Sequence, residues 1–415
     1  MRYFVFPILF IVLFSCNTVE IVEQNIQEEI QEVEENIQEE IKEDENKVFI
    51  DFLDSEWEKT LNNNPLFATY IGDKRSNNII NSNSIEQFII EKDSSIESLN
   101  NLKKIKFSKL SDENKLNYRL YEFGINRDID LRNFPTYFLR INQRGGIQSF
   151  YETGNRLVYS SIQDYYDWLS RLNIFSENIN NFIEINKEGL LKGITQPNII
   201  TESVIVQIDA IIDSEIDKNP YMKVFMEADS NLMSKTEKDE LVIKAKEIVN
   251  NKIIPAYINL NNFLKNQYLP NSRNSIGISD VPGGKEYYEY LAKFYTTTDL
   301  TPDQIHEIGL DEIKRIRSEM ELIIKKVNWD GDFNSFLNYL RTSPRFYYDN
   351  SEDLFNAYLI MSKTIDPLLT KIFKVFPRAP YGVIPIPEES APFTTTAYYN
   401  SPSPGRPGYF YANLY

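Results

Sequence analysis

The chain has 415 residues, 42% of them hydrophobic and 13% aromatic, which is the composition of a globular protein with a substantial core. Its formal net charge is −17, and residues 20–46, with twelve acidic residues and one lysine, carry −11 of it. The rest of the chain is therefore at −6, and it has no basic stripe that could neutralise phosphates. These numbers argue against nucleic acid as a partner.

The first residues predict export and a lipid anchor. Arg2 precedes an unbroken apolar run from Tyr3 to Leu13, which at eleven residues is too short for a membrane span of about 20 residues but typical of a signal peptide. Leu13-Phe14-Ser15-Cys16 resembles the bacterial lipobox, in which the cysteine receives a diacylglycerol. We therefore expect residues 1–15 to be a signal peptide. Lipid on Cys16 would then hold the protein to a membrane in the bacterial cell envelope, outside the cytoplasm.

The alternative is an ordinary secretory signal that happens to contain a cysteine. In either case Cys16 is the only cysteine, which rules out disulfides within the chain.

Residues 16–46 form an acidic tether in this interpretation. Asn25 to Ile30 (NIQEEI) recurs eleven residues later as Asn36 to Ile41, and the isoleucines fall on one face of a helix. The segment could be a short oligomerising helix. Its charge density favours a solvated spacer, helical or disordered, that holds the next domain away from the membrane.

Residues 47–415 are predicted to be one mainly helical domain. Phe49, Phe52, Leu53, Trp57 and Leu61 lie on one face of a first helix, which ends before Pro65. The same helical spacing is found around residues 85–130, 162–190, 204–218, 235–266, 284–296, 302–327, 333–341 and 351–376.

The helix with the clearest start begins after Thr301, because Pro302 and Gln304 complete a capping box. Its apolar residues Ile313, Ile316, Met320 and Ile323 are expected in the core, with Gly309 allowing another helix to approach closely.

The last forty residues change character, because eight prolines between Pro377 and Pro407 prevent a helix. Strand composition begins at about residue 392, with Thr394–Tyr399 and Tyr409–Tyr415 as two strands of a β-hairpin joined by residues 400–408. The chain stops within the second predicted strand. We therefore expect an incomplete domain with an unpaired strand at its end.

No catalytic or metal-binding motif is complete. His306 is the only histidine, and Leu310 stands where an H-E-x-x-H zinc helix needs its second histidine, so His306 is expected to be a surface residue. No nucleophile elbow supports a Ser-His-Asp triad. Gly145-Gly146 and Gly283-Gly284 lack phosphate-loop spacing and predict turns. Paired carboxylates for glycoside hydrolysis stay open, because acidic residues are frequent.

Four segments together resemble one bacterial family, domain of unknown function 885, whose members are expected to be zinc metallopeptidases. They are Asn64–Gly72 (NPLFATYIG), Glu188–Pro197 (EGLLKGITQP), Gly283–Leu310, and the pair Ala397–Tyr399 and Arg406–Asn413. The resemblance implies a helical, cleft-forming peptidase body. In the family an H-E-x-x-P-G-H-H helix follows the hairpin, and no residue of this chain matches it.

The resemblance therefore places neither a catalytic residue nor a metal ligand on this chain, and zinc is expected only for the full-length family. It implies that the hairpin lines a substrate cleft, which makes five residues candidates for peptide binding: Tyr399, Arg406, Tyr409, Tyr411 and Asn413. Arg406 could instead hold its own loop, and the tyrosines could simply pack.

Two functions follow as alternatives. The chain is the N-terminal portion of a lipid-anchored zinc metallopeptidase, inactive alone, or it is a non-enzymatic surface lipoprotein that binds peptides or another partner.

Overall fold

The computed structural model describes residues 44–388 and 391–415. The predicted signal peptide, Cys16 and almost all of the acidic tether lie outside these residues. The chain divides into two compact units. Within the described residues the first unit comprises 44–58 with 95–126, and the second comprises 59–94 with 127–415.

The first unit is built from parts of three helices, α2 (Glu45–Asn63), α4 (Ile85–Leu102) and α5 (Asp112–Leu131). Phe49 is fully buried and stacks with Phe52, as its place on the predicted apolar face requires. Glu56 accepts hydrogen bonds from Ser98 Oγ at 2.7 Å and from Tyr121 Oη at 2.9 Å. Burial, together with this carboxylate, raises the pKa of Tyr121, so the phenol stays protonated.

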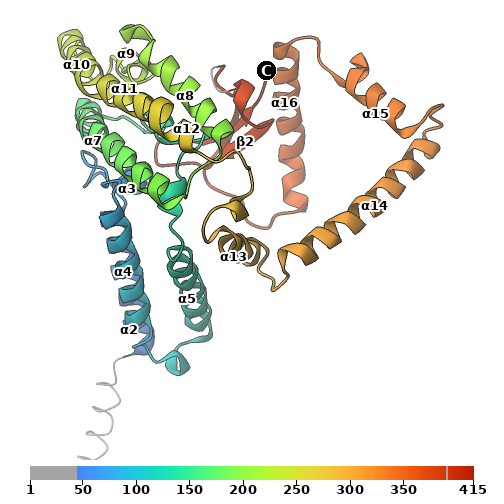
Figure 1. The fold of residues 1–415 in the computed structure, drawn as a ribbon, viewed down its shortest axis with the longest axis horizontal. Helices are drawn as coiled ribbons and strands as arrows, with labels where there is room; N and C mark the ends of the chain where they lie inside the picture. Colours follow the sequence, from blue (N-terminus) through green and yellow to red (C-terminus); the bar gives the residue numbers. More distant parts are fainter. Residues whose placement is uncertain (1–43, 389–390) are drawn as a thin grey trace, which may run out of the picture. The chain divides into compact units, whose positions relative to one another are not determined.

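The second unit has its core between helices α7 (Ile162–Lys192), α8 (Asn198–Ile212), α10 (Lys235–Ile248) and α11 (Ile254–Phe263), which lie side by side in Figure 1. α7 starts at a capping box between Ser161 and Asp164 and ends at Gly193, whose φ of 68° is available to glycine at little cost. Its apolar side, including Trp168, Leu172 and Ile179, is almost completely buried.

The helix predicted at 235–266 continues to Asn271 and contains two π-helical stretches, η5 (Val249–Ile253) and η6 (Leu264–Tyr268), before α12 (Leu269–Asn271). Each stretch comes just before a proline, Pro255 or Pro270. Proline has no N–H to donate to the preceding turn. A locally wider turn accommodates this loss without ending the helix.

Three polar residues of α7, spaced seven apart on one face, bind the segment that follows α3 (Pro65–Tyr70). Asp164, Arg171 and Asn178 are 8%, 1% and 6% exposed, respectively. Asp164 accepts from Lys74 Nζ at 2.7 Å, whereas Asn178 donates to Asn81 O at 2.9 Å and accepts from the backbone N–H of Asn83 at 3.0 Å. We call these three residues the α7 polar ladder.

Arg171, the middle residue of this ladder, forms no ion pair with a carboxylate among the described residues. Its guanidinium donates to the carbonyls of Pro65, Ser76 and Ile79 at 3.0–3.1 Å and to Thr69 Oγ1 at 2.6 Å. Burial lowers its pKa to about 10, so it is still a cation at neutral pH. The sequence N-P-L-F-A-T-Y-I-G is therefore held in place by a buried charge.

Helices α13 (Gly284–Thr296), α14 (Pro302–Lys326), α15 (Phe333–Thr342) and α16 (Ser351–Ile365) follow in chain order and are largely exposed. The predicted capping box at Thr301 is confirmed, with reciprocal bonds to Gln304 at 2.9 and 3.2 Å.

The prediction that the α14 stripe is core was wrong. Ile313, Ile316, Met320 and Ile323 are 64%, 45%, 36% and 55% exposed. A Cβ at Gly309 would meet no atom within 4 Å, so no helix approaches there in the described chain.

The chain ends in a three-stranded sheet of order β1-β3-β2, built from β1 (Tyr381–Pro385), β2 (Ala397–Asn400) and β3 (Gly408–Ala412). The predicted hairpin is confirmed by the antiparallel pairing of β2 with β3. β1 was missed, and it pairs with β3 in parallel. The expectation of an unpaired last strand was therefore wrong, because β3 is the central strand and has a neighbour on both sides.

The mainly helical fold is confirmed, with shifted boundaries. The segment predicted at 204–218 is α8 followed by a short η4 (Ile216–Lys218), and residues 103–111 interrupt the one predicted at 85–130. α16 ends at Ile365 because Pro367 disfavours helix before it. The remaining elements are η1 (Phe107–Lys109), η2 (Thr136–Leu139), η3 (Ile147–Ser149), α6 (Tyr151–Arg156), α9 (Lys223–Met226), η7 (Ile278–Asp280), η8 (Pro344–Phe346), η9 (Asp366–Lys371) and η10 (Ala391–Phe393). Among the described residues, no helix has the length and hydropathy of a membrane span.

The clamp formed by Arg171 leads to a stability prediction. Arg171→Met keeps the apolar volume but leaves three carbonyls and the Thr69 hydroxyl without their donor, so the free energy of unfolding should fall by about 3 kcal/mol. Urea denaturation followed by the fluorescence of Trp168, three residues away on α7, measures this. Arg341→Met, at an exposed position of α15, is the control and should change the free energy of unfolding by less than about 0.5 kcal/mol. Equal effects of the two variants would contradict the clamp.

Candidate functional site

A cavity of about 980 Å³ lies in the second unit, and we call it the main cavity. It lies between the start of α3, the segment bound by the α7 polar ladder, the 139–156 region and α7. Ligand sites in proteins occupy roughly 300–1,000 Å³. The main cavity therefore has room for a ligand as large as a short peptide.

The floor of this cavity is aromatic. Phe150 and Phe175 stack with their ring centroids 4.0 Å apart and their planes at 15°. Phe175 and Phe182 are 4% and 3% exposed, whereas Phe67 at the opening is 41% exposed. Stacked, buried rings lose little freedom when a ligand covers them, so the floor is a preorganised apolar surface.

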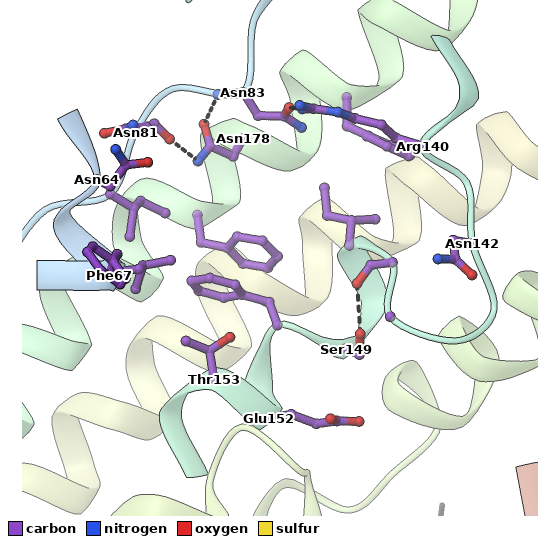
Figure 2. A pocket seen from close by; sticks show the side chains of 18 of the residues that line it. Asn64, Phe67, Asn81, Asn83, Arg140, Asn142, Ser149, Glu152, Thr153 and Asn178 are labelled. Atoms are coloured by element: carbon purple, nitrogen blue, oxygen red, sulfur yellow. Dashed lines mark hydrogen bonds between the residues drawn. The ribbon is translucent and has the colours of Figure 1, made fainter. Parts of the chain in front are cut away.

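One wall consists of amides. Figure 2 shows Asn81 and Asn83 joined to Asn178 by hydrogen bonds, with the side chain of Arg140 directed toward Asn83. The guanidinium of Arg140 donates to Asn83 Oδ1. The α7 polar ladder thus also fixes the geometry of this wall.

The opposite side is the turn at Asn142–Gly146, where the sequence predicted a tight turn. Gln148 Nε2 donates to Asn142 O at 2.9 Å, and Ser149 Oγ donates to Gly146 O at 2.8 Å. A Cβ at Gly146 would lie 2.6 Å from the backbone carbonyl oxygen of Asn142, so glycine is required there. The turn presents Arg144 to the cavity.

A second cavity of about 400 Å³, the sheet-side cavity, is lined by residues of α6, α9 and the C-terminal sheet. Glu152 and Arg156, an ion pair four residues apart on α6, line both cavities. Tyr398 of β2 and Tyr411 of β3 stack at the sheet-side cavity, with ring centroids 4.7 Å apart.

The five residues predicted to bind substrate are not on one surface. Tyr409 and Tyr411 alternate with Phe410 along β3 and so share one face of the sheet. Tyr399 is paired with Phe410 across the strands and therefore lies on the other face, where it is 51% exposed. Of the five, Tyr411 lines the sheet-side cavity.

Arg406 and Asn413 use their polar groups within the protein. Arg406 Nη2 donates to Ser401 O at 2.7 Å and to Tyr70 Oη at 3.1 Å, which connects the β2–β3 loop to α3. Asn413 Nδ2 donates to the carbonyls of Ala391 and Thr395 at 2.8 and 3.1 Å. A ligand would have to compete with these bonds.

Metal ligands are not gathered in the described part of the chain. No group of three or more His, Cys, Asp and Glu residues suited to a metal ion is found there. His306 is exposed near the start of α14, as expected for a surface residue. The residues present therefore do not fit a zinc site.

The main cavity was not predicted. Arg140, Asn142 and Arg144 are close in sequence around a glycine pair, which predicted only a turn. The signal that could have found them is two arginines beside a Gly-Gly turn in a chain whose overall charge is negative.

The contacts of Arg406 lead to a prediction about the hairpin loop. Arg406→Lys keeps the charge but cannot reach Ser401, Tyr70 and the Pro407 carbonyl together, so amide exchange in residues 401–407 should become about tenfold faster. Tyr70→Phe should have a smaller effect of the same sign. Hydrogen exchange with mass spectrometry measures both variants, with Tyr399→Phe as the control that leaves the loop unchanged. Unaltered exchange in Arg406→Lys would argue that the guanidinium is available to a ligand.

Comparison with known proteins identifies the family. The chain is similar to the crystal structure of a predicted lipoprotein from Colwellia psychrerythraea, with a TM-score of 0.78 and 20% identity over 89% of this chain and 68% of that one. It is also similar to a predicted lipoprotein of unknown function from Shewanella oneidensis, with a TM-score of 0.54 and 17% identity over 88% of this chain and 64% of that one. At these identities the likeness is one of fold.

This chain thus spans about two thirds of the length of each of the two structures. No curated protein matches it. The model of the family described as bacterial protein of unknown function (DUF885) matches residues 65–415, and the chain belongs to that family.

Proposed function

We propose that this protein is anchored by lipid on Cys16 to a membrane of the bacterial cell envelope, outside the cytoplasm, and that residues 47–415 are the substrate-binding portion of a zinc metallopeptidase. The metal site would come from polypeptide that this sequence does not contain, so the chain alone would be inactive. The observation that carries the proposal is the main cavity, with its preorganised aromatic floor and fixed polar walls.

The leader supports the lipid anchor. A short apolar run after Arg2 and a cysteine preceded by a small residue are what lipid attachment needs. Both similar structures are of proteins described as predicted lipoproteins. The acidic residues 20–46 would then be the spacer between the membrane and the folded units.

The sheet supports peptides as the ligand class. β1 and β2 are the edges of the three-stranded sheet, so one side of each has backbone groups that β3 does not use. An extended peptide can add to such an edge through main-chain hydrogen bonds. Tyr398 and Tyr411 would flank a peptide that also entered the sheet-side cavity.

The alternative is a non-enzymatic lipoprotein that binds peptides without cleaving them. The main cavity supports it, because an aromatic floor and fixed polar walls can hold a ligand without any chemical step. The two proposals differ in whether a metal-bearing segment exists.

The coding DNA downstream of codon 415 tests the peptidase proposal directly. We expect translation of this DNA, in one of the three frames, to contain an H-E-x-x-P-G-H-H motif. The purified 415-residue chain should hold only substoichiometric zinc by elemental analysis. An intact unrelated gene immediately after the stop codon would favour the non-enzymatic alternative, and tight stoichiometric zinc would contradict both.

The anchor is tested separately. The N-terminal peptide of the protein from its native membrane should start at Cys16 and carry a diacylglycerol by mass spectrometry. Cys16→Ser should abolish the modification, because the thiol is the attachment point. Ser15→Ala keeps a small residue before the cysteine and should leave lipidation intact. A wild-type N-terminus with unmodified Cys16 would rule out the anchor.

A further inference from the structure

The charge in the main cavity is opposite to that of the chain. The lining contains three arginines, Arg140, Arg144 and Arg156, but one acidic residue, Glu152. Glu152 and Arg156 neutralise each other as an ion pair. Two positive charges therefore remain in the cavity of a protein with a net charge of −17.

In the part of the chain that the structure describes, Arg140 forms no ion pair, although the carboxylate of Glu91 attracts its charge. Its guanidinium is bonded to the neutral amide oxygen of Asn83, and the nearby carboxylate of Glu91 accepts instead from Arg132 at 2.9 Å. Arg140 as a residue is exposed, yet the protein atoms around its guanidinium desolvate the charge and lower its pKa. A desolvated cation beside neutral amides is a place where an anion is stabilised.

Arg144 is presented by a turn that does not use its charge. The backbone N–H of Arg144 donates to Asn142 Oδ1 at 2.9 Å, and the side-chain amide of Gln148 donates to Asn142 O. Both bonds stabilise the turn. Among the residues that the structure describes, the Arg144 guanidinium has no hydrogen bond or ion pair. Its backbone is thus ordered while its charge is available.

Next to these cations lies the aromatic floor, with Phe150 stacked on Phe175. A ligand with both an apolar body and an anionic group would cover the rings and reach the arginines at once. Carboxylates suit planar guanidinium groups, which bind both oxygens.

We propose that the main cavity binds ligands that carry a carboxylate next to an apolar body, with Arg140 and Arg144 holding the carboxylate and Phe150 and Phe175 the apolar part. The choice of ligand rests on the proposed function. If the protein binds peptides, the carboxylate is the free C-terminus of an apolar peptide. A fatty acid has the same chemistry and is distinguished by the test.

The test compares acid and amide forms of one probe on the full wild-type chain, so it does not depend on any variant folding. The probe is an N-acetylated tetrapeptide of alternating alanine and phenylalanine, with a free carboxylate or a C-terminal amide. We expect the acid to bind at least about tenfold more tightly by isothermal titration calorimetry, because charge-assisted hydrogen bonds are lost in the amide. Raising the salt concentration should narrow this difference.

Variants then locate the site. Arg140→Gln and Arg144→Gln should each reduce the ratio of the affinity for the acid to the affinity for the amide. In the double variant the two affinities should agree to within about twofold. Arg341→Gln, which removes an exposed arginine far along the chain on α15, is the matched control and should keep the preference for the acid. A second comparison uses decanoate and decanol. If the chain binds decanoate more tightly than decanol but binds neither peptide, the carboxylate site is supported and its ligand is a fatty acid.

Equal binding of acid and amide, no binding of any carboxylate at millimolar concentration, or an unchanged preference in the double variant would each overturn the inference. Its failure is distinguishable from that of the proposed function. The downstream DNA and the zinc content decide whether a peptidase exists, whereas carboxylate binding is measured on this chain without metal or catalysis.

Discussion

The structure of the second unit depends on a buried guanidinium. Arg171 is 1% exposed and donates hydrogen bonds to three carbonyls and a hydroxyl from residues 65–79. A charge that is removed from water needs such partners to offset the cost of its burial. Asp164 and Asn178 each lie seven residues, about two helical turns, from Arg171 in opposite directions along α7. Asp164 binds Lys74 within the same segment, and Asn178 binds Asn81 just after it. An irregular segment is thereby held along α7 in one register, and this segment is a wall of the main cavity.

That arrangement explains how an irregular segment can form a wall of the main cavity. Its backbone groups are satisfied by side chains of a rigid helix instead of by a sheet or a helix of its own. The burial of Asp164 acts to raise its pKa, but the hydrogen bonds from Lys74 and Ser160 outweigh burial and keep the pKa of this carboxyl below its usual range. The carboxylate is thus charged at neutral pH, as the contact with Lys74 requires.

The distribution of charge and apolar surface connects the fold to its function. The acidic residues are concentrated in 20–46, whereas the main cavity keeps two arginines without acidic partners. In α14 the apolar residues Ile313 and Ile323 are more than half exposed, although their spacing is that of a buried helix face. Helical spacing alone therefore does not establish that this face of α14 is buried.

Much of the secondary structure of this protein follows from local sequence pattern. The helices at α7, α13, α14 and α15, the capping box at Thr301, the turns at the glycine pairs and the β2–β3 hairpin could be predicted, because spacing, caps and turn residues act within a few positions. The family could also be predicted from four motifs. The anchor on Cys16 and the spacer are still predictions, since they lie outside the described residues.

The tertiary structure alone decided the rest. β1 could not be predicted, because its stability comes from pairing with a strand more than twenty residues later. That pairing makes β3 the central strand of the sheet instead of an exposed edge. The α7 polar ladder likewise depends on contacts between residues about ninety positions apart, and Arg140 of the main cavity contacts Asn83, 57 positions earlier. Periodicity shows which side of a helix is apolar, but only packing shows whether anything covers that side. In α14 the residues Ile313, Ile316, Met320 and Ile323 stay 36–64% exposed within the described chain.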